Sequence, residues 1–186
     1  MITSQQITTA DTDWYQFMEH VLVGSFPPEE RRPLSELRRV AEQRTNLFHL
    51  FIVLNGDTPV GFYNYWHFPT FYYTEHLAIA PAYRNHGYGK QLIASLLDRI
   101  DLPLIIEVEP PATETARRRI SFYKQLGFRL WERDYLQPPY SPALESVPLK
   151  LMTCGALNLA CDDTYNLVCG TIHREVYGVR EIFVHS

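Results

Sequence analysis

The sequence has no long hydrophobic run and no block of one charge. A run such as Leu47 to Leu54 is far shorter than the roughly 20 residues that a helix needs to span a membrane, so no membrane partner is expected. The 186 residues carry a net charge of -4 with both signs interspersed. That balance leaves no extended positive surface and argues against nucleic acid as the principal partner. The N-terminal residues lack the charged-then-apolar pattern of a signal peptide, so we expect a cytoplasmic protein.

Cysteine is also scarce, and its spacing gives no metal motif. Cys154, Cys161 and Cys169 form no CxxC pair, and no histidine stands at metal-ligand spacing from them. We expect free thiols in a reducing compartment and no bound metal. The apolar content is that of a globular chain long enough for one sizeable core. A single domain over residues 1–186 is therefore predicted, with residues 155–186 as a C-terminal helical extension.

Two helices are predicted before any long strand. Residues 11–23 and 34–43 place apolar side chains at helical spacing, and the segment between them holds prolines and a dense cluster of charges. From Leu47 the pattern changes to β-rich runs on either side of Asn55-Gly56-Asp57, which predicts a hairpin. A third run, residues 71–80, extends this meander.

The stretch from Glu75 to Leu97 reads as a strand, a glycine-bearing turn and a helix. The first amides of a helix have no intrahelical acceptor, and the helix dipole adds positive partial charge, so an anion can bind there. Gly87 and Gly89 let a ligand approach the main chain closely, and Arg84 and Lys90 add full positive charge. The sequence therefore predicts a phosphate site at this helix start.

Two common phosphate motifs do not fit this turn. A P-loop needs Ser or Thr after Gly-Lys, but Gln91 follows Gly89-Lys90. A dinucleotide fingerprint needs a third glycine where Leu92 stands. The spacing that does fit is Arg-x-x-Gly-x-Gly, carried by Arg84, Gly87 and Gly89.

A second motif lies further along the chain, in a helix predicted from about residue 113 to residue 126. It reads Phe122-Tyr123-Lys124-Gln125-Leu126-Gly127-Phe128, and Gly127 is placed to end the helix. Together with Arg84-x-x-Gly-x-Gly, this phrase resembles the two markers of the GNAT superfamily of N-acetyltransferases, in the family's order and separation. The resemblance covers residues 72–131.

The resemblance implies an α/β fold of α+β type. Its central sheet would be mixed and mostly antiparallel, with helices on both faces, and the strand at Leu77 to Ile79 would splay from the strand at Leu104 to Val108. Acetyl-CoA, the acyl donor, would bind where these strands separate. The reaction implied is transfer of the acetyl group to a primary amine of a small molecule or peptide, by direct attack in a ternary complex.

The resemblance also assigns cofactor contacts. The main chain of Leu77, Ala78 and Ile79 would bind pantetheine. The pyrophosphate would be held by the turn and helix start, namely Arg84, Asn85, His86, Gly87, Tyr88, Gly89 and Lys90. Tyr123 matches the tyrosine that can protonate the leaving thiolate, and a phenol with a pKa of about 10 remains a proton donor at neutral pH. Where many members carry asparagine and alanine on this helix, the chain has Ala116 and Arg119.

The amine must be neutral when it attacks, so a proton acceptor is needed. Glu75 ranks first because it matches a glutamate used by some members, followed by Glu109 and Glu107, which share one face of the next strand. Salt bridges with arginines are the alternative explanation for all three. In a regular strand His76 would point away from Glu75 and pack in the core. The run Arg117 to Arg119 could hold CoA phosphates or form a solvated helix face.

Two questions stay open at this level. A second enzyme hypothesis keeps the CoA cofactor but uses another acyl chain or an oxygen acceptor, and a third is a regulatory module that binds acyl-CoA without turnover. A final helix over residues 163–177, after a strand at residues 149–152, would pack either on the sheet or on a second copy of the chain in a homodimer.

Overall fold

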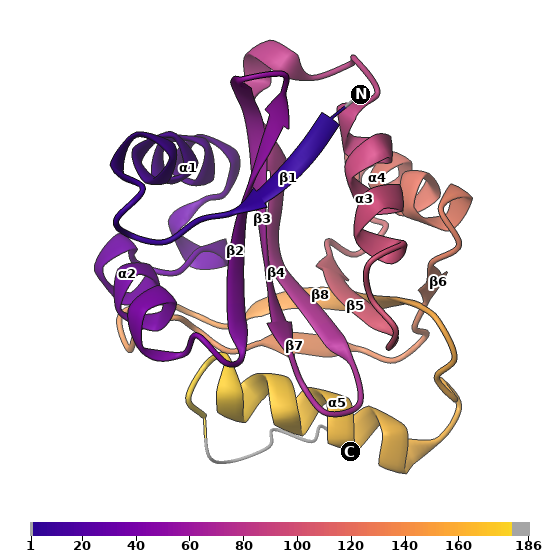
Figure 1. The fold of residues 1–186 in the computed structure, drawn as a ribbon. Coiled ribbons are helices and arrows are strands. Elements are labelled where there is room, and N and C mark those ends of the chain that lie inside the picture. Colours follow the sequence, from indigo (N-terminus) through magenta and orange to yellow (C-terminus); the bar gives the residue numbers. More distant parts are fainter. Residues whose placement is uncertain (1, 180–186) are drawn as a thin grey trace. The chain divides into compact units, whose positions relative to one another are not determined.

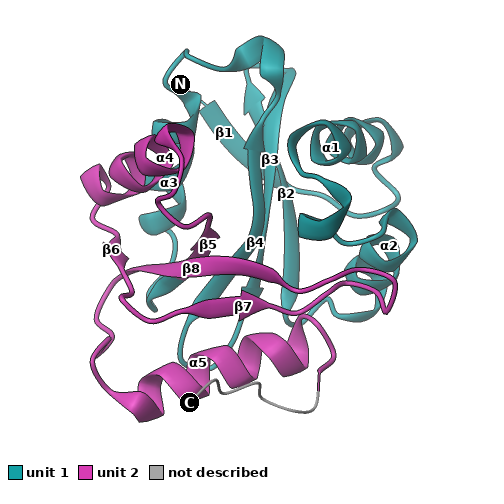
Figure 2. Cartoon of the chain, turned by 180° about the vertical axis from the view of Figure 1, so that it is seen from behind, with its two compact units in different colours: residues 1–104 teal, residues 105–186 magenta. Residues whose placement is uncertain are grey.

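The computed structural model describes residues 2–179, which contain both strands and helices (Figure 1). The elements are β1 (Ile2–Gln6), α1 (Thr12–Ser25), η1 (Pro28–Glu30), α2 (Leu34–Gln43), β2 (Phe48–Asn55), β3 (Thr58–His67), β4 (Tyr72–Ile79), η2 (Pro81–Tyr83), α3 (Tyr88–Leu97), β5 (Leu104–Val108), α4 (Glu114–Gln125), β6 (Arg129–Leu130), β7 (Tyr135–Gln137), β8 (Val147–Cys154) and α5 (Asp162–Glu175). The chain divides into two units, residues 1–104 and 105–186, which are coloured separately in Figure 2.

The first unit contains a four-stranded antiparallel sheet in the order β1-β2-β3-β4. Gly56 joins β2 to β3 with a φ of 61°, a conformation that glycine adopts without steric cost. The predicted hairpin is therefore confirmed at its turn. Helices α1 and α2 lie on one side of these strands and α3 lies on the other (Figure 1).

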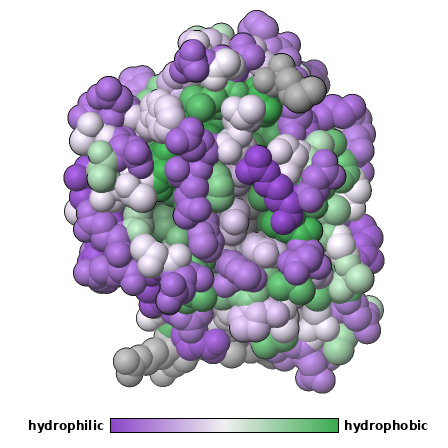
Figure 3. All heavy atoms as spheres, viewed as in Figure 1, coloured by the Kyte–Doolittle hydropathy of each residue, from purple (hydrophilic) through white to green (hydrophobic). Residues whose placement is uncertain are grey.

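Apolar side chains on both faces of this sheet are shielded from water. On the side of α1 and α2, Met18, Leu22 and Leu37 have no exposed surface, and Leu92 and Ile93 of α3 are equally buried. Burial of this kind is the main favourable contribution to folding, at about 25 cal/mol for each Å² of apolar surface removed from water. On the molecular face in Figure 3, hydrophilic residues dominate and hydrophobic residues form smaller patches.

Strand β4 contains an irregularity that the sequence pattern does not reveal. Asn64 lies opposite His76 and Trp66 lies opposite Tyr73, so β4 has one more residue than β3 across this interval. An extra residue interrupts the alternation of side chains along a strand. The prediction that His76 points away from Glu75 assumed a regular strand and is wrong, because both side chains contact the same segment, residues 30–32.

In the second unit, β8 lies between β5 and β6 and also pairs with β7. Both β6 and β7 run antiparallel to β8. Helix α5 buries Val168, Cys169 and Ile172, and its His173 packs against the Tyr135 ring of β7 with centroids 5.6 Å apart. Of the two surfaces predicted for this helix, it packs on the strands of its own unit. Residues 180–186 of the predicted extension lie outside the described residues.

The α/β class is confirmed, with mostly antiparallel strands and helices in each unit. Helix α2 has the predicted bounds, and the predicted helices α1, α3, α4 and α5 and strands β2 to β5 and β8 are all present. The sequence analysis missed β6 and β7. Among the described residues, no helix combines the length and apolarity needed to cross a membrane.

Gly61 gives a test of the sheet geometry. A Cβ at this position would lie 2.5 Å from the carbonyl oxygen of Ala78, closer than side-chain carbons approach main-chain oxygens. We expect Gly61→Ala to lower the free energy of unfolding by about 1–3 kcal/mol, measured by urea denaturation. Gly24→Ala is the matched control, because nothing lies within 4 Å of its Cβ and alanine is the better helix former. Equal stability of the two variants would contradict the β3–β4 register.

Candidate active site

The turn between β4 and α3 leaves the start of α3 open. Asn85 and Gly87 both have positive φ, at 66° and 76°, and Gly87 occupies the N-cap position without any side-chain cap. The first main-chain bond of the helix runs from Gln91 N–H to the Gly87 carbonyl. The N–H groups of Tyr88, Gly89 and Lys90 therefore have no acceptor within the helix, which is the donor arrangement that a phosphate group fits.

Two side chains brace this turn. Arg84 donates from Nε to the Ile79 carbonyl at 3.0 Å and from Nη2 to Ser25 Oγ at 3.2 Å, so it ties the turn to the end of β4 and to α1. His86 Nδ1 lies 2.7 Å from the Arg84 carbonyl and must carry a proton to bond there. The His86 ring stacks on the ring of Tyr88 with centroids 5.7 Å apart. The turn is thus fixed by its own side chains.

The main-chain N–H and C=O groups of β4 point alternately to its two edges. Ala80 N–H donates to the Val60 carbonyl of the segment that forms β3, and main-chain groups in a strand alternate between its two edges. Ala78 therefore also faces β3, whereas Leu77 and Ile79 turn their amides and carbonyls to the opposite edge. Of the three residues predicted to bind pantetheine through the main chain, Leu77 and Ile79 have the orientation for it.

Glu75 lies in a buried ion pair. Its side chain has no exposed surface, and Arg32, at 8% exposure, donates to Oε1 from Nε at 3.1 Å and from Nη2 at 3.0 Å. Trp66 Nε1 donates to Oε2 at 2.7 Å. A buried carboxylate is stable only when it is paired and hydrogen-bonded, and these donors meet that requirement. The alternative explanation offered for Glu75, a salt bridge with an arginine, describes these contacts.

His76 lies in a second set of buried contacts on the same strand. Its main-chain N–H donates to Asn64 Oδ1, which places Asn64 Nδ2 3.4 Å from His76 Nδ1 as a donor. Nε2 then donates to the Glu30 carbonyl at 3.2 Å, and Phe26 packs edge-on against the ring. Burial lowers the pKa of His76, so the neutral ring is favoured. The predicted role as a packed core histidine agrees with its burial.

In the second unit, both ends of α4 are capped. Thr113 accepts a hydrogen bond from the Ala116 N–H at the helix start. At the helix end Gly127 takes a φ of 89°, its N–H donates to the Lys124 carbonyl, and Phe128 N–H donates to the Tyr123 carbonyl. This paired arrangement is a Schellman motif. It explains why glycine and a following hydrophobic residue close the Tyr123 motif.

Tyr123 is held between two aromatic rings. The ring of Phe128 lies 5.3 Å from the Tyr123 ring at 64°, and that of Phe122 lies at the same distance. Burial raises the pKa of Tyr123 and the charge of Arg119 lowers it by a smaller amount. The phenol therefore stays protonated at neutral pH, as a proton donor to a leaving thiolate must be.

The other two candidate carboxylates have different partners. Glu109 Oε2 accepts from Arg119 Nη1 at 3.0 Å, and both side chains are more than two-fifths exposed. The charge of Arg119 also lowers the pKa of Tyr123, so Arg119 interacts with both Glu109 and Tyr123 in the second unit. Glu107 accepts from the Tyr177 hydroxyl at 3.2 Å. Sequence reasoning missed Tyr177, which follows α5 and shares no motif with β5.

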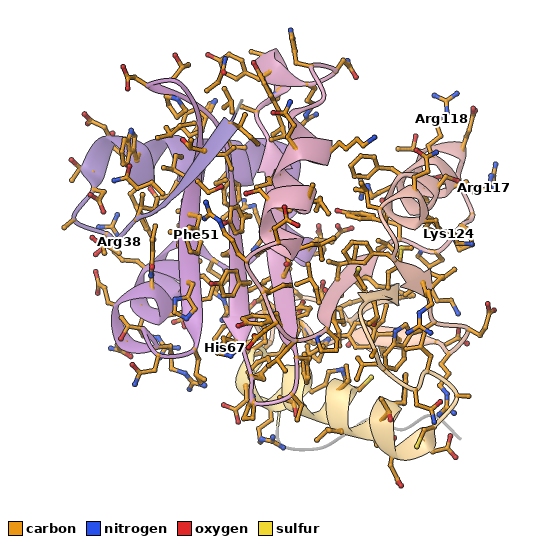
Figure 4. The ribbon with its side chains drawn as sticks, turned by 45° about the vertical axis from the view of Figure 1, so that its right-hand side comes forward. Arg38, Phe51, His67, Arg117, Arg118 and Lys124 are labelled. Atoms are coloured by element: carbon orange, nitrogen blue, oxygen red, sulfur yellow. The ribbon has the colours of Figure 1, made fainter. Side chains whose placement is uncertain are left out.

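Arginines of the run on α4 form contacts with residues close to them in sequence. Arg117 donates to the Pro111 and Ala112 carbonyls, and Arg118 pairs with Glu114 one turn earlier. Arg117, Arg118 and Lys124 extend outward from α4 (Figure 4). Of the two roles considered for this run, these contacts favour a solvated helix face. The described residues contain no group of three or more His, Cys, Asp or Glu that could hold a metal ion.

The two ion pairs give a matched test of burial. Glu75→Gln leaves the Arg32 guanidinium buried without a counter-charge, so we expect a loss of about 3–5 kcal/mol in unfolding free energy. Glu109→Gln breaks an exposed pair and should cost no more than about 1 kcal/mol. Urea denaturation at neutral pH measures both. A Glu75→Gln loss as small as that of Glu109→Gln would contradict the buried pair.

Comparison with known proteins agrees with this geometry. The sequence model of an acetyltransferase (GNAT) domain matches residues 46–130. A solved structure described as a GNAT-family acetyltransferase from Bacteroides thetaiotaomicron is 46% identical, with a TM-score of 0.90, and the match covers 95% of this chain and 99% of that chain. A GNAT-family acetyltransferase from Elizabethkingia anophelis with acetyl-CoA bound is 15% identical, with a TM-score of 0.54 over 83% of this chain and 98% of that chain, and supports the fold alone.

Curated relatives match over shorter stretches. Mycothiol acetyltransferase from Saccharopolyspora erythraea is 50% identical over 44 residues, which are 24% of this chain and 14% of that protein. The chain spans 24% and 14% of the lengths of the first two curated relatives that it matches. The match to the Bacteroides protein, in contrast, covers nearly the full length of both chains. The chain belongs to the GNAT family of acetyltransferases, which use acetyl-CoA.

Proposed function

We propose that this chain transfers the acetyl group of acetyl-CoA to a primary amine of a small molecule or peptide, by direct attack in a ternary complex. The observation that carries the proposal is the open start of α3, where the amides of Tyr88, Gly89 and Lys90 lack helix acceptors behind a glycine N-cap. Family membership supplies the expected ligand for those amides, the pyrophosphate of CoA.

The chemistry of the donors fits that ligand. Consecutive N–H groups at a helix start bind phosphate oxygens, and the Lys90 ammonium adds a full positive charge. Asn85 and His86 complete the turn, and Arg84 would act mainly by holding it, since its guanidinium bonds Ile79 and Ser25. Leu77 and Ile79 direct main-chain groups away from β3, where the amide groups of pantetheine could pair with them as an added strand would, although the Ile79 carbonyl already accepts from Arg84.

The reaction needs one proton acceptor and one proton donor. Acetyl-CoA supplies a thioester whose carbonyl carbon the neutral amine attacks. A C–N bond forms, the C–S bond breaks, the amine loses a proton and the sulfur gains one. We assign the proton on sulfur to the Tyr123 hydroxyl, because burial keeps this phenol protonated.

Glu75 and Glu109 are the proposed proton acceptors, and their contacts predict different behaviour. Both oxygens of Glu75 already accept hydrogen bonds from Arg32 and Trp66, so Glu75 would act through a water or after a rearrangement. Glu109 is partly exposed beside Arg119 and is reachable by water. The pH dependence of kcat in Glu75→Gln and Glu109→Gln separates them, because only loss of the acceptor removes the acidic limb of the profile.

We further propose that residues 1–186 act as one domain in the cytoplasm. The three cysteines are free thiols, which is the usual state in a reducing compartment.

Acetyl-CoA should raise the melting temperature, because a ligand that binds only the folded chain stabilises it. Lys90→Gln should weaken the binding of acetyl-CoA by about three- to fivefold, as expected for loss of one partly exposed charge at a helix start. Lys150→Gln is the control, because Lys150 pairs with Asp134 in the second unit. No shift in melting temperature at millimolar acetyl-CoA would contradict the cofactor assignment.

Tyr123→Phe should lower kcat by roughly 10²–10⁴-fold, the usual contribution of a general acid, with acetyl-CoA affinity nearly unchanged. Tyr72→Phe is the matched control, because its hydroxyl bonds Asp101. Since the raised pKa keeps Tyr123 protonated, kcat of the wild type should not fall until the pH exceeds about 10. An unchanged kcat in Tyr123→Phe would remove the acid role.

Release of CoA across a panel of amines, followed by thiol detection, tests transfer itself. Release with an amine and acetyl-CoA supports the proposal, and faster release with a longer acyl-CoA would indicate another acyl chain. Stabilisation by acetyl-CoA without release for any amine or alcohol would instead favour the regulatory module.

A further inference from the structure

Arg31 and Arg32 are neighbours in sequence, but only Arg32 is neutralised by a carboxylate that the structure identifies. Arg32 pairs with Glu75. Arg31 forms no hydrogen bond or ion pair with any residue from 2 to 179, and its Nε is shielded from water without an acceptor. An arginine that is only partly exposed and lacks an anion is unusual, because leaving a shielded N–H unpaired costs about 1–3 kcal/mol.

The segment that carries Arg31 is held in place. Pro27 and Pro28 fix two backbone φ angles before it, and Pro33 fixes one after it. His76 Nε2 bonds the Glu30 carbonyl on one side of Arg31, and Glu75 holds Arg32 on the other. The main chain around Arg31 therefore has little conformational entropy left to lose when a ligand binds, which favours binding over an arginine in a mobile segment.

The local charge also favours an anion. Burial is the main cause that lowers the pKa of His76, and the positive charges of Arg32 and Arg31 lower it further, which places Arg31 within electrostatic reach of this buried ring. The His76 ring itself is neutral, with Nδ1 accepting from Asn64 and Nε2 donating to Glu30. Within residues 2–179 no carboxylate pairs with the Arg31 guanidinium, and its charge acts on His76 of β4, the strand that also carries Glu75 and Leu77.

We propose that Arg31 binds the carboxylate of the acceptor, so that the substrate carries a carboxylate as well as the amine that is acetylated. A guanidinium offers parallel N–H donors that match the planar carboxylate, and a modest rotation of the side chain would bring the shielded Nε–H into use. Amino acids and short peptides have this chemistry. The inference rests on the proposed acetyl transfer and names the class of acceptor for it.

Binding can be tested without turnover. In ¹⁵N-labelled protein saturated with CoA, the Arg Nε–H signal that disappears in Arg31→Gln is assigned to Arg31. We expect at least one standard L-amino acid to shift this signal in a saturable way, and its C-terminal amide to leave it unmoved. Amides that shift the signal as strongly as the acids, or a whole panel of acids without effect, would overturn the inference.

Steady-state kinetics then measure how much the contact between Arg31 and the carboxylate contributes to kcat/KM. For an amino acid that binds, kcat/KM should exceed that of its amide by roughly ten- to a hundredfold, the value of about 1.5–3 kcal/mol for a hydrogen bond to a charged group. Arg31→Gln should abolish this preference while the amide reacts as before, and Arg31→Lys should retain only part of it. Arg39→Gln, which alters an exposed pair with Glu36 on α2, is the control.

Failure of this inference can be told apart from failure of the proposed function. If acetyl-CoA stabilises the chain and amines release CoA without any preference for carboxylates, only the role of Arg31 is wrong. If carboxylates shift the Arg31 signal but no CoA is released from any acceptor, Arg31 binds an anion and the transfer step is wrong. A larger shift with inorganic phosphate than with any amino acid would overturn the carboxylate assignment.

Discussion

A carboxylate without exposed surface, that of Glu75, is the constraint on which much of the first unit depends. Such a charge is tolerated only with donors around it, and here Arg32 and Trp66 provide them. To reach Glu75, the segment before α2 must pack against β4, where His76 and Phe26 add further contacts. The extra residue in β4 lets Glu75 and His76 contact this segment together. One ion pair therefore couples a loop, a strand irregularity and the placement of Arg31.

The cofactor side depends on a different constraint, which is that the first amides of a helix must find acceptors. Gly87 begins α3 without a side-chain cap, and Arg84 and His86 stiffen the turn by bonding main-chain carbonyls. The protein thus keeps the donors open and the geometry fixed before any ligand arrives, which lowers the entropic cost of binding. In the second unit, the cap at Gly127 likewise fixes local geometry, because its hydrogen bonds hold the end of α4 that carries Tyr123.

Local patterns predicted most of this fold, since helix period, turn chemistry and glycine positions act over a few residues. Helix α2, the hairpin at Gly56 and the cap at Gly127 follow from such signals. Strands β6 and β7 were missed because two or three residues carry no periodicity. The Arg32–Glu75 pair joins residues 43 positions apart, and the added residue in β4 shows only against β3. No local pattern encodes such pairings. The sequence therefore did not predict that both oxygens of Glu75 accept hydrogen bonds or that His76 faces the same segment as Glu75.

The central claim is that the start of α3 binds the pyrophosphate of acetyl-CoA. Amide NMR measures this most directly, by titration of ¹⁵N-labelled protein with CoA and, separately, with pantetheine, which lacks the pyrophosphate. The account predicts saturable shifts of the Tyr88, Gly89 and Lys90 amide signals with CoA and much smaller shifts at those residues with pantetheine. Equal shifts with both ligands, or shifts with CoA that leave residues 88–90 unchanged, would contradict it.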